Sequence, residues 1–113
     1  MSKLCTFCKN VHHEIPATIV YEDDKILAFN DIRPAAPVHV LLIPKTHYDT
    51  LGDVPSGDAV LSHLAEVGKK VAEQMGLREG YRLVVNVGDN GGQTVYHLHL
   101  HLLGGRFMAW PPG

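Results

Sequence analysis

The 113-residue sequence predicts a single α+β domain in which one long helix covers one face of a mixed or antiparallel sheet. Two observations support this: short β-rich runs lie on both sides of one amphipathic stretch, and the length fits one domain. The composition is that of a globular protein, with 45% hydrophobic and 19% charged residues. The formal net charge of −2 argues against binding a nucleic-acid backbone, which requires a basic surface.

The N-terminal half predicts a short helix or turn and then three strands. The segment CTFCKNVHHEIP ends at Pro16, because the residue before a proline is biased away from helix. The β-rich runs 17–24 and 26–31 are separated by charged residues and predict a hairpin. After the loop RPAAP, the apolar run VHVLLIP at 38–44 predicts a central strand that ends at Pro44.

The C-terminal half predicts one helix and two strands. From Ser56 to Met75, apolar residues recur at helical spacing, namely Val60, Leu64, Val67, Val71 and Met75. The run 81–88 predicts a strand, DNGGQT a glycine-rich loop, and VYHLHLHLLGG at 95–105 a final strand. The tail RFMAWPPG predicts no regular structure.

Three histidines alternate with leucines in the final predicted strand. His97, His99 and His101 should share one face of the sheet, and the leucines should pack against the helix on the other. Solvated surface residues explain three histidines in register poorly. One zinc ion bound by all three is opposed by geometry, because His97 and His101 start about 13 Å apart along a strand.

Catalysis at phosphorus fits this histidine pattern better. The upstream loop GDNGGQT offers backbone N–H groups that can form an anion-binding nest, and a neutral imidazole is a competent nucleophile. The sequence has neither a P-loop nor a DxD cluster for magnesium, so kinase or ATPase chemistry is not expected.

Cys5 and Cys8 form a Cys-X-X-Cys pair, which is half of a tetrahedral zinc site. Redox use and unmetallated buried thiols are the alternatives. The sequence has no apolar run long enough to span a membrane, and its N-terminus lacks the apolar core of a secretory signal. We therefore expect a cytoplasmic protein, without a membrane or nucleic-acid partner, whose cysteines stay reduced.

The run HLHLHLL resembles the His-X-His-X-His-X-X signature, with X apolar, of the histidine triad (HIT) family. The similarity extends over nearly the whole chain and is closest to the branch of histidine triad nucleotide-binding proteins. It implies one HIT domain over 1–113, with a Cys-X-X-Cys segment at 1–16 and a tail at 104–113. Each subunit would have a five-stranded, mainly antiparallel sheet, one long helix and a short N-terminal helix.

The same resemblance implies a purine nucleoside phosphoramidase. It would cleave the P–N bond of purine nucleoside 5′-phosphoramidates, with aminoacyl adenylates as a further substrate class, through a nucleotidyl-histidine intermediate. His99 would be the nucleophile, His101 would donate to the phosphate, and His39 would support the row from the neighbouring strand. Thr94 would assist the leaving amine, at a position where many relatives have serine. No cofactor would be required for catalysis.

The residues that the resemblance assigns to a purine nucleotide similar to AMP or GMP would surround its base, ribose and phosphate. They are Asp31 for the ribose hydroxyls; Phe7, Phe29 and Ile32 for the base; Asn86, Gly92 and Gln93 for sugar and phosphate; and Trp110 near the leaving group. Without the resemblance, Asp31 reads as turn chemistry, Phe7, Phe29 and Ile32 as core, and His39 as a hydrogen-bonded core histidine.

The resemblance also implies a structural zinc ion bound by Cys5, Cys8, His47 and His97. It further implies a homodimer in which the tail carrying Trp110 reaches the partner's active site, although packing of Trp110 on its own core is the alternative. A nucleotide-binding scaffold or regulatory module with incidental activity remains the alternative function.

Overall fold

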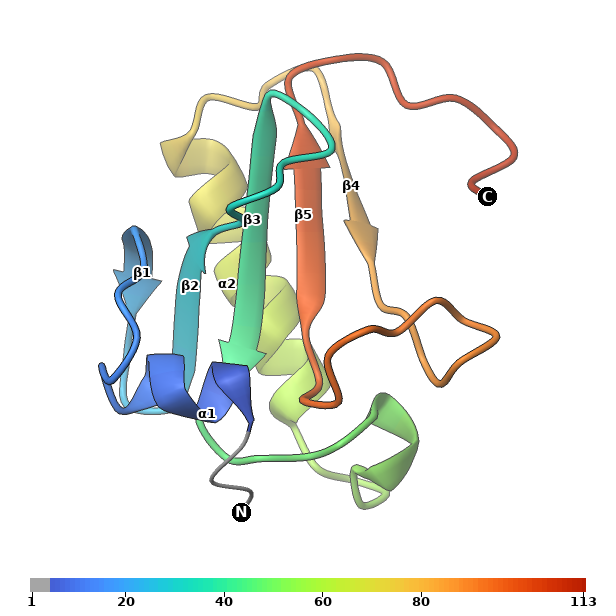
Figure 1. The fold of residues 1–113 in the computed structure, drawn as a ribbon. Helices are drawn as coiled ribbons and strands as arrows, with labels where there is room; N and C mark the ends of the chain where they lie inside the picture. The colour runs from blue at the N-terminus through green and yellow to red at the C-terminus, as the bar shows by residue number, and fades with distance from the viewer. Residues whose placement is uncertain (1–4) are drawn as a thin grey trace.

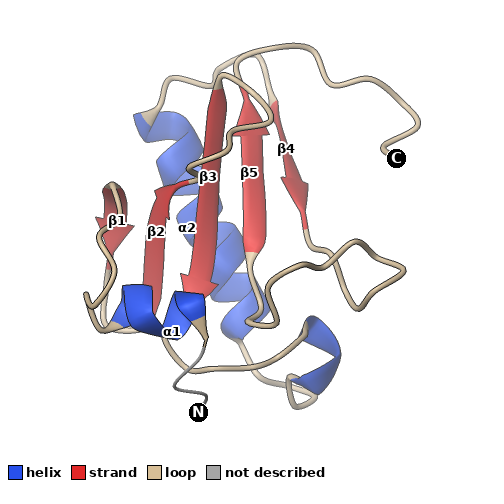
Figure 2. Cartoon of the chain, in the orientation of Figure 1, coloured by secondary structure: helices blue, strands red, loops and turns tan. Residues whose placement is uncertain are grey.

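The computed structural model describes residues 5–113 as a five-stranded sheet with a helix on each face (Figure 1). The first four residues of the expected Cys-X-X-Cys segment lie outside the described residues. The strand order is β1-β2-β3-β5-β4, and every neighbouring pair is antiparallel. The longer helix α2 (Val60–Gln74) lies behind the sheet in this view and the short helix α1 (Thr6–Val11) lies in front of it (Figure 2). The α+β prediction is confirmed.

The predicted hairpin is formed by β1 (Ile19–Glu22) and β2 (Ile26–Asn30). Asp23 closes its turn, because its Oδ1 accepts hydrogen bonds from the backbone N–H groups of Lys25 and Ile26 at 2.8 and 2.7 Å. Such a side-chain bond to the backbone is a typical turn device.

The centre of the sheet is β3 (Val38–Pro44), which pairs with β2 on one side and with β5 (Leu100–Gly104) on the other. This confirms VHVLLIP as a central strand, and all its residues after Val38 are buried. The register places Leu41 opposite His101, so the histidine row lies beside β3.

The last strand begins later than predicted, at Leu100, so that only His101 of the three histidines lies in it. The proline at the end of β3 explains this, because Pro44 has no N–H to extend the ladder. The Pro44 carbonyl instead accepts a hydrogen bond from His97 Nε2 at 2.8 Å, and the Leu98 N–H donates to the Tyr48 carbonyl at 2.7 Å. The in–out alternation of side chains nevertheless persists through this segment.

Two further predicted boundaries were wrong. Helix α2 starts at Val60 rather than Ser56, because Gly57 has a φ of +83° and Asp58 then accepts the Val60 N–H. The strand predicted over 81–88 ends at Val84, as β4 (Tyr81–Val84). As an edge strand, β4 pairs only with β5, which is itself short.

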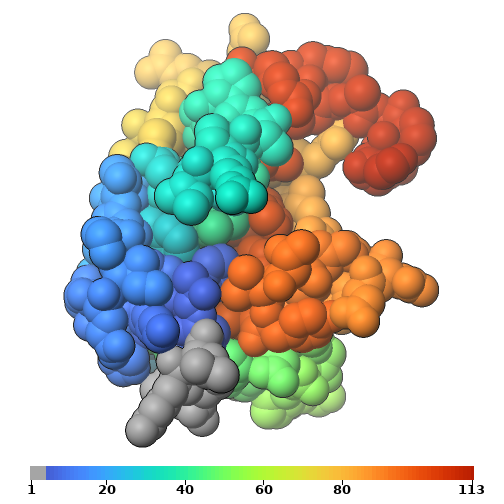
Figure 3. Space-filling view, in the orientation of Figure 1, coloured from blue at the N-terminus to red at the C-terminus, as the bar shows by residue number. Residues whose placement is uncertain are grey.

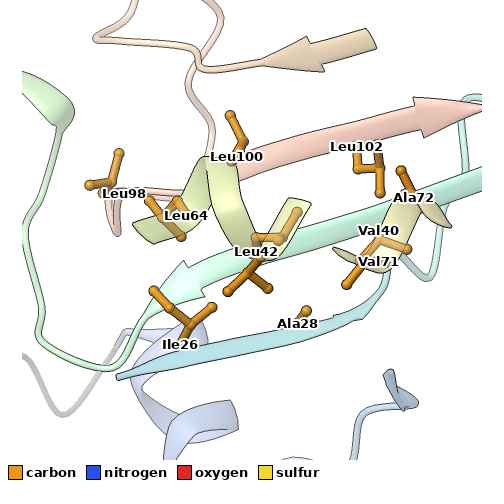
Figure 4. Close-up of a cluster of buried hydrophobic side chains, with 11 residues drawn as sticks. Ile26, Ala28, Val40, Leu42, Leu64, Val71, Ala72, Leu98, Leu100 and Leu102 are labelled. Carbon is orange, nitrogen blue, oxygen red and sulfur yellow. The ribbon is translucent and has the colours of Figure 1, made fainter. Parts of the chain in front are cut away.

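The hydrophobic core lies between the sheet and α2 (Figure 4). Leu98, Leu100 and Leu102 point into it, as predicted, and meet Leu64 and Val71 of the helix. A second, smaller cluster covers the opposite face of the sheet and consists of Phe7, Leu27, Phe29, Leu41 and Ile43. Within residues 5–113, no helix has both the length and the apolar character needed to cross a bilayer.

Candidate functional site

A cavity of about 410 Å³ opens on the face of the sheet that carries α1. It lies where the N-terminal segment, the loop after β2 and the end of the glycine-rich loop come together, on the face shown in Figure 3. His99 and His101 line its floor together with Leu41 of β3. The alternation of side chains thus directs the histidines to a cavity and the leucines to the core.

The His99 ring has a defined tautomer. Its Nδ1 lies 2.8 Å from the His97 carbonyl oxygen, and a carbonyl can only accept, so Nδ1 carries the proton. In the neutral ring the lone pair is then on Nε2. Burial lowers the pKa of His99, which keeps the ring neutral at physiological pH. Phe7 packs edge-on against this ring, with centroids 5.2 Å apart.

His39 and His101 form a hydrogen-bonded pair across β3 and β5. His39 Nε2 lies 2.9 Å from His101 Nδ1 and 3.4 Å from Asp31 Oδ2. His39 is buried, as the core-histidine alternative required, but it also contacts the triad. Burial lowers the pKa of His39, and it lowers that of His101 to about 4. Both rings are therefore neutral near pH 7.

The structure brings several of the expected substrate residues to the cavity wall. They are Phe7, Phe29, Asp31, Ile32 and Thr94. Phe7 and Phe29 pack edge-on against one another, with centroids 5.7 Å apart, and thus serve the core and the cavity at once. Ile32 is 91% exposed, so the reading of it as core is wrong.

Four expected contact residues do not line this cavity: Asn86, Gly92, Gln93 and Trp110. Gln93 is buried and its side chain braces the loop, accepting from the Gly88 N–H and donating to the Asp49 and Val95 carbonyls. Trp110 is 80% exposed, which excludes packing on its own core. Gly92 has a φ of +83° and shapes the turn of the loop.

Sequence reasoning missed other cavity residues, including Thr6, Asn10 and Arg33. Arg33 is two residues beyond Asp31, whose Oδ1 accepts the Arg33 N–H at 2.8 Å. Its closeness in sequence to Asp31, which the resemblance assigns to the site, is a signal that could have identified Arg33. Asn10 gave no such signal, because its position depends on where α1 docks.

A second histidine cluster lies at the end of β3, below α1. Cys5, Cys8, His47 and His97 place one ligand atom each within 4.8 Å of one another. The Sγ–Nδ1 distances are 3.4 Å for Cys5–His97, 3.2 Å for Cys8–His47 and 3.6 Å for Cys8–His97, and the two Nδ1 atoms are 3.1 Å apart. A zinc tetrahedron with bonds of about 2.05 Å to nitrogen and 2.3 Å to sulfur has edges of about 3.3–3.8 Å. The cluster therefore has the dimensions of a zinc site.

The protons of the two imidazoles also fit a metal ion. His97 Nε2 donates to the Pro44 carbonyl, and His47 Nε2 lies 2.7 Å from Asp49 Oδ1. Both rings thus carry their proton on Nε2, and two Nδ1 lone pairs face each other. A cation between them removes this repulsion, and outer hydrogen bonds of this kind are typical of zinc-bound histidines.

The two thiols are poorly suited to redox exchange. Burial and the neighbouring Cys5 raise the pKa of Cys8 to about 11, which disfavours the reactive thiolate. A bound cation would supply the charge that stabilises the thiolates. The donor set therefore fits zinc better than a catalytic disulfide.

Comparison with known proteins gives a consistent result. The family model described as HIT domain matches residues 12–108. A protein named 14 kDa zinc-binding protein from Zea mays is 52% identical over 95% of this chain and 86% of its own length. Adenylylsulfatase HINT1 from Arabidopsis thaliana is 51% identical over 95% of this chain and 75% of its own length. The crystal structure of a HIT family hydrolase from Legionella pneumophila superposes with a TM-score of 0.94 at 58% identity, covering 96% of this chain and 99% of that one.

Proposed function

The chain belongs to the HIT family, and from that premise we propose that it hydrolyses the P–N bond of purine nucleoside 5′-phosphoramidates. Its family and relatives make it a HIT-type hydrolase, and the substrate is our proposal. The observation that carries it is the tautomer of His99, whose neutral ring has its lone pair on Nε2 at a cavity wall.

In the first step, His99 Nε2 attacks the phosphorus and forms a P–N bond to the imidazole. The bond between phosphorus and the substrate nitrogen breaks, and this nitrogen takes up one proton from solvent, so that the group leaves as a neutral amine; the second step returns one proton to solvent. Thr94 lines the cavity, and its hydroxyl is the group we assign to assist this departure. His101 stabilises the charge on the phosphate oxygens by donating a hydrogen bond.

In the second step, water attacks the phosphorus of the nucleotidyl-histidine. One proton of this water is lost as the P–N bond to His99 breaks, and the nucleoside monophosphate leaves. The ring returns to its starting tautomer, because the His97 carbonyl still accepts the Nδ1 proton. The fixed hydrogen bond thus serves both half-reactions.

The remaining cavity residues would bind the nucleoside. We assign the base to the wall formed by Phe7, Phe29 and Ile32, and the ribose hydroxyls to Asp31. Adenylyl compounds with a mixed-anhydride bond, such as aminoacyl adenylates, carry the same phosphate and are a second substrate class. The adenylylsulfatase among the relatives supports an adenylyl substrate.

Zinc, in this proposal, is structural. Cys5, Cys8, His47 and His97 would hold it, and its role is to attach α1 to the sheet. That attachment positions Phe7 against His99. No catalytic step requires the metal.

We further propose a cytoplasmic homodimer in which Trp110 acts on the partner's substrate. Its 80% exposure leaves the indole available to a second copy, and Arg82 orders the backbone before it by donating to the Met108 and Ala109 carbonyls at 3.4 and 2.9 Å. The free cysteines suit a reducing compartment.

The deciding experiment is to trap the intermediate on His99. Wild-type protein mixed with adenosine 5′-phosphoramidate and quenched in base should carry one adenylyl group on the peptide that contains residue 99. His99→Asn retains a donor for the His97 carbonyl and should bind AMP without forming the adduct. If wild type gives neither adduct nor turnover yet binds AMP, the protein is a nucleotide-binding module and the proposal fails.

A further inference from the structure

Which nitrogen of His101 carries the proton decides whether this ring can donate to a phosphate. The 2.9 Å contact between His39 Nε2 and His101 Nδ1 needs one proton but does not say whose it is. If it belonged to His101 Nδ1, the Nε2 of that ring would be an acceptor and would repel phosphate oxygens. Something outside the pair must choose between the two arrangements.

The backbone of Ala35 makes that choice, together with the Asp31 carboxylate, whose Oδ2 lies 3.4 Å from His39 Nε2 and also favours a proton there. The Ala35 N–H points at His39 Nδ1, with a nitrogen–nitrogen distance of 2.9 Å. A peptide N–H can only donate, so His39 Nδ1 must accept. The proton of the neutral His39 ring is then on Nε2, from which it is donated to His101 Nδ1. In the neutral His101 ring the remaining proton is on Nε2.

His99 and His101 thereby receive opposite tautomers from two peptide groups. A carbonyl, that of His97, holds the proton of His99 on Nδ1, and an N–H, that of Ala35, holds the proton of His101 on Nε2 through His39. One ring is left as a nucleophile and the other as a donor, as phosphoryl transfer needs.

Ala35 lies in the irregular loop between β2 and β3, so its N–H needs external support. Arg106 provides it, because its Nη2 donates to the Ala35 carbonyl at 3.0 Å while its Nη1 donates to the Phe107 carbonyl at 3.0 Å. Arg106 lies two residues after the end of β5 at Gly104, and the chain approaches the loop closely here. A Cβ on Gly105, whose φ is +90°, would lie 2.8 Å from the Pro37 Cβ.

We propose that Arg106 is a positioning residue that holds the loop backbone at Ala35, by binding the carbonyl of the peptide group that follows the Ala35 N–H, and so keeps the proton of His101 on Nε2. This inference rests on the proposed function, in which His101 donates to the phosphate. Arg106 does not line the substrate cavity and acts only through Ala35 and His39.

The test compares two arginines that both bind carbonyl groups of the C-terminal segment. Arg106→Met releases Ala35, whereas Arg82→Met releases only Met108 and Ala109. Long-range ¹⁵N–¹H NMR of the imidazoles, recorded without substrate, reports which nitrogen of each ring is protonated. Wild type and Arg82→Met should show His39 and His101 protonated on Nε2.

In Arg106→Met, the His39 and His101 shifts should move towards a mixture of both tautomers, and those of His99 should not. The kcat for adenosine 5′-phosphoramidate should fall about tenfold, the loss typical of one hydrogen bond to a charged group, with little change in KM. Arg106→Lys, which keeps a donor, should restore part of both. Ala35→Pro, which removes the N–H itself, should give the same shift in tautomer.

Unchanged tautomers in a folded Arg106→Met protein would overturn the proposal, whatever its activity. Because the NMR measurement needs no turnover, it also separates the two proposals. A wild-type protein without hydrolase activity but with the expected shifts would refute the proposed function and retain the positioning role of Arg106.

Discussion

Two groups of histidines lie on the same face of one sheet. They differ in which ring nitrogen donates a hydrogen bond to a protein oxygen and which one is left with the lone pair. In the cluster of Cys5, Cys8, His47 and His97, both rings donate from Nε2 to protein oxygens and turn their Nδ1 lone pairs towards two thiols. In the cavity, His99 donates from Nδ1 instead, which leaves the lone pair of its neutral ring on Nε2. Neighbouring positions of one motif thus acquire different chemistry from the carbonyl that each ring meets.

The largest effects are expected when histidine is replaced by asparagine at position 99 and, separately, at position 97. His99→Asn should lower turnover by at least about 10³-fold, because it removes the nucleophile, and should leave one zinc per chain. His97→Asn should abolish zinc binding and still form the covalent adduct, because the residue 97 carbonyl remains. Steady-state kinetics and metal analysis of both proteins give the answer. Loss of zinc in His99→Asn, or of the adduct in well-folded His97→Asn, would contradict the division of roles.

Removal of the metal should lower the Tm of the protein only when the cluster of Cys5, Cys8, His47 and His97 is intact. A ligand present at a hundred times its Kd stabilises the folded state by about 2.7 kcal/mol, which corresponds to a Tm change on the order of 10 °C for a domain of this size. A chelator should therefore lower the Tm of the wild-type protein by that amount. Cys5→Ser should already have the lower Tm and should not respond to the chelator. Equal responses of the two proteins would remove zinc from the cluster.

Lowering the pH should reduce the free energy of unfolding through protonation of His101 in the cavity. Its folded pKa of about 4 lies below the unfolded value of about 6.5, so between these values the unfolded chain binds a proton that the folded chain excludes. The free energy of unfolding should therefore fall as the pH is lowered from about 6.5 towards 4, and this contribution should be complete above that window.

Urea denaturation at pH 7.5, 6 and 5 can measure the His101 contribution by comparing Cys5→Ser with Cys5→Ser/His101→Gln. The shared zinc-free background cancels the effect of acid on metal binding. The variant with glutamine should have the shallower pH dependence. Parallel curves would show that His101 is not responsible.

The smallest expected effect concerns Thr94. Thr94→Ser keeps the hydroxyl and frees χ1, so kcat should change by no more than about threefold, mainly for bulky amines. Thr94→Val keeps the shape and removes the hydroxyl, and it should lose far more activity with poor leaving groups than with good ones. A series of phosphoramidates of graded amine pKa would measure this. Equal losses across the series would remove Thr94 from leaving-group assistance.

Local patterns in the sequence predicted much of the fold. The alternation at 97–102 predicted both faces of the final segment, and the stripe from Val60 to Met75 predicted the helix face. Boundaries were less predictable, because they depend on partners elsewhere in the chain. The ladder between β3 and β5 ends at Leu100, because Pro44 has no N–H to donate and the Leu98 N–H donates to the Tyr48 carbonyl instead.

Site residues that belong to a sequence motif could be predicted. Contributions of backbone groups, which depend on how the loops fold, could not. The alternation with leucines identified the three histidines of the final segment, and the resemblance to the family identified Asp31. The contribution of Ala35 could not be identified, since alanine has no functional side chain and its N–H matters only through the loop geometry. For Gln93 the prediction was of substrate contact, but its side chain instead hydrogen-bonds backbone groups at Gly88 and Asp49 and so stabilises the loop.

The position of β5 has a consequence for how the chain folds. This strand comes last in the sequence yet lies between β3 and β4. Residues 38–42 therefore cannot form these hydrogen bonds until residues 100–104 are available. Cys5 likewise meets His97 across 92 positions. Such a high contact order predicts slow folding compared with helical domains of similar size. Until residue 104 has been synthesised, β3 and β4 present unpaired edges, and nascent chains of this protein should depend on protection from aggregation during that interval.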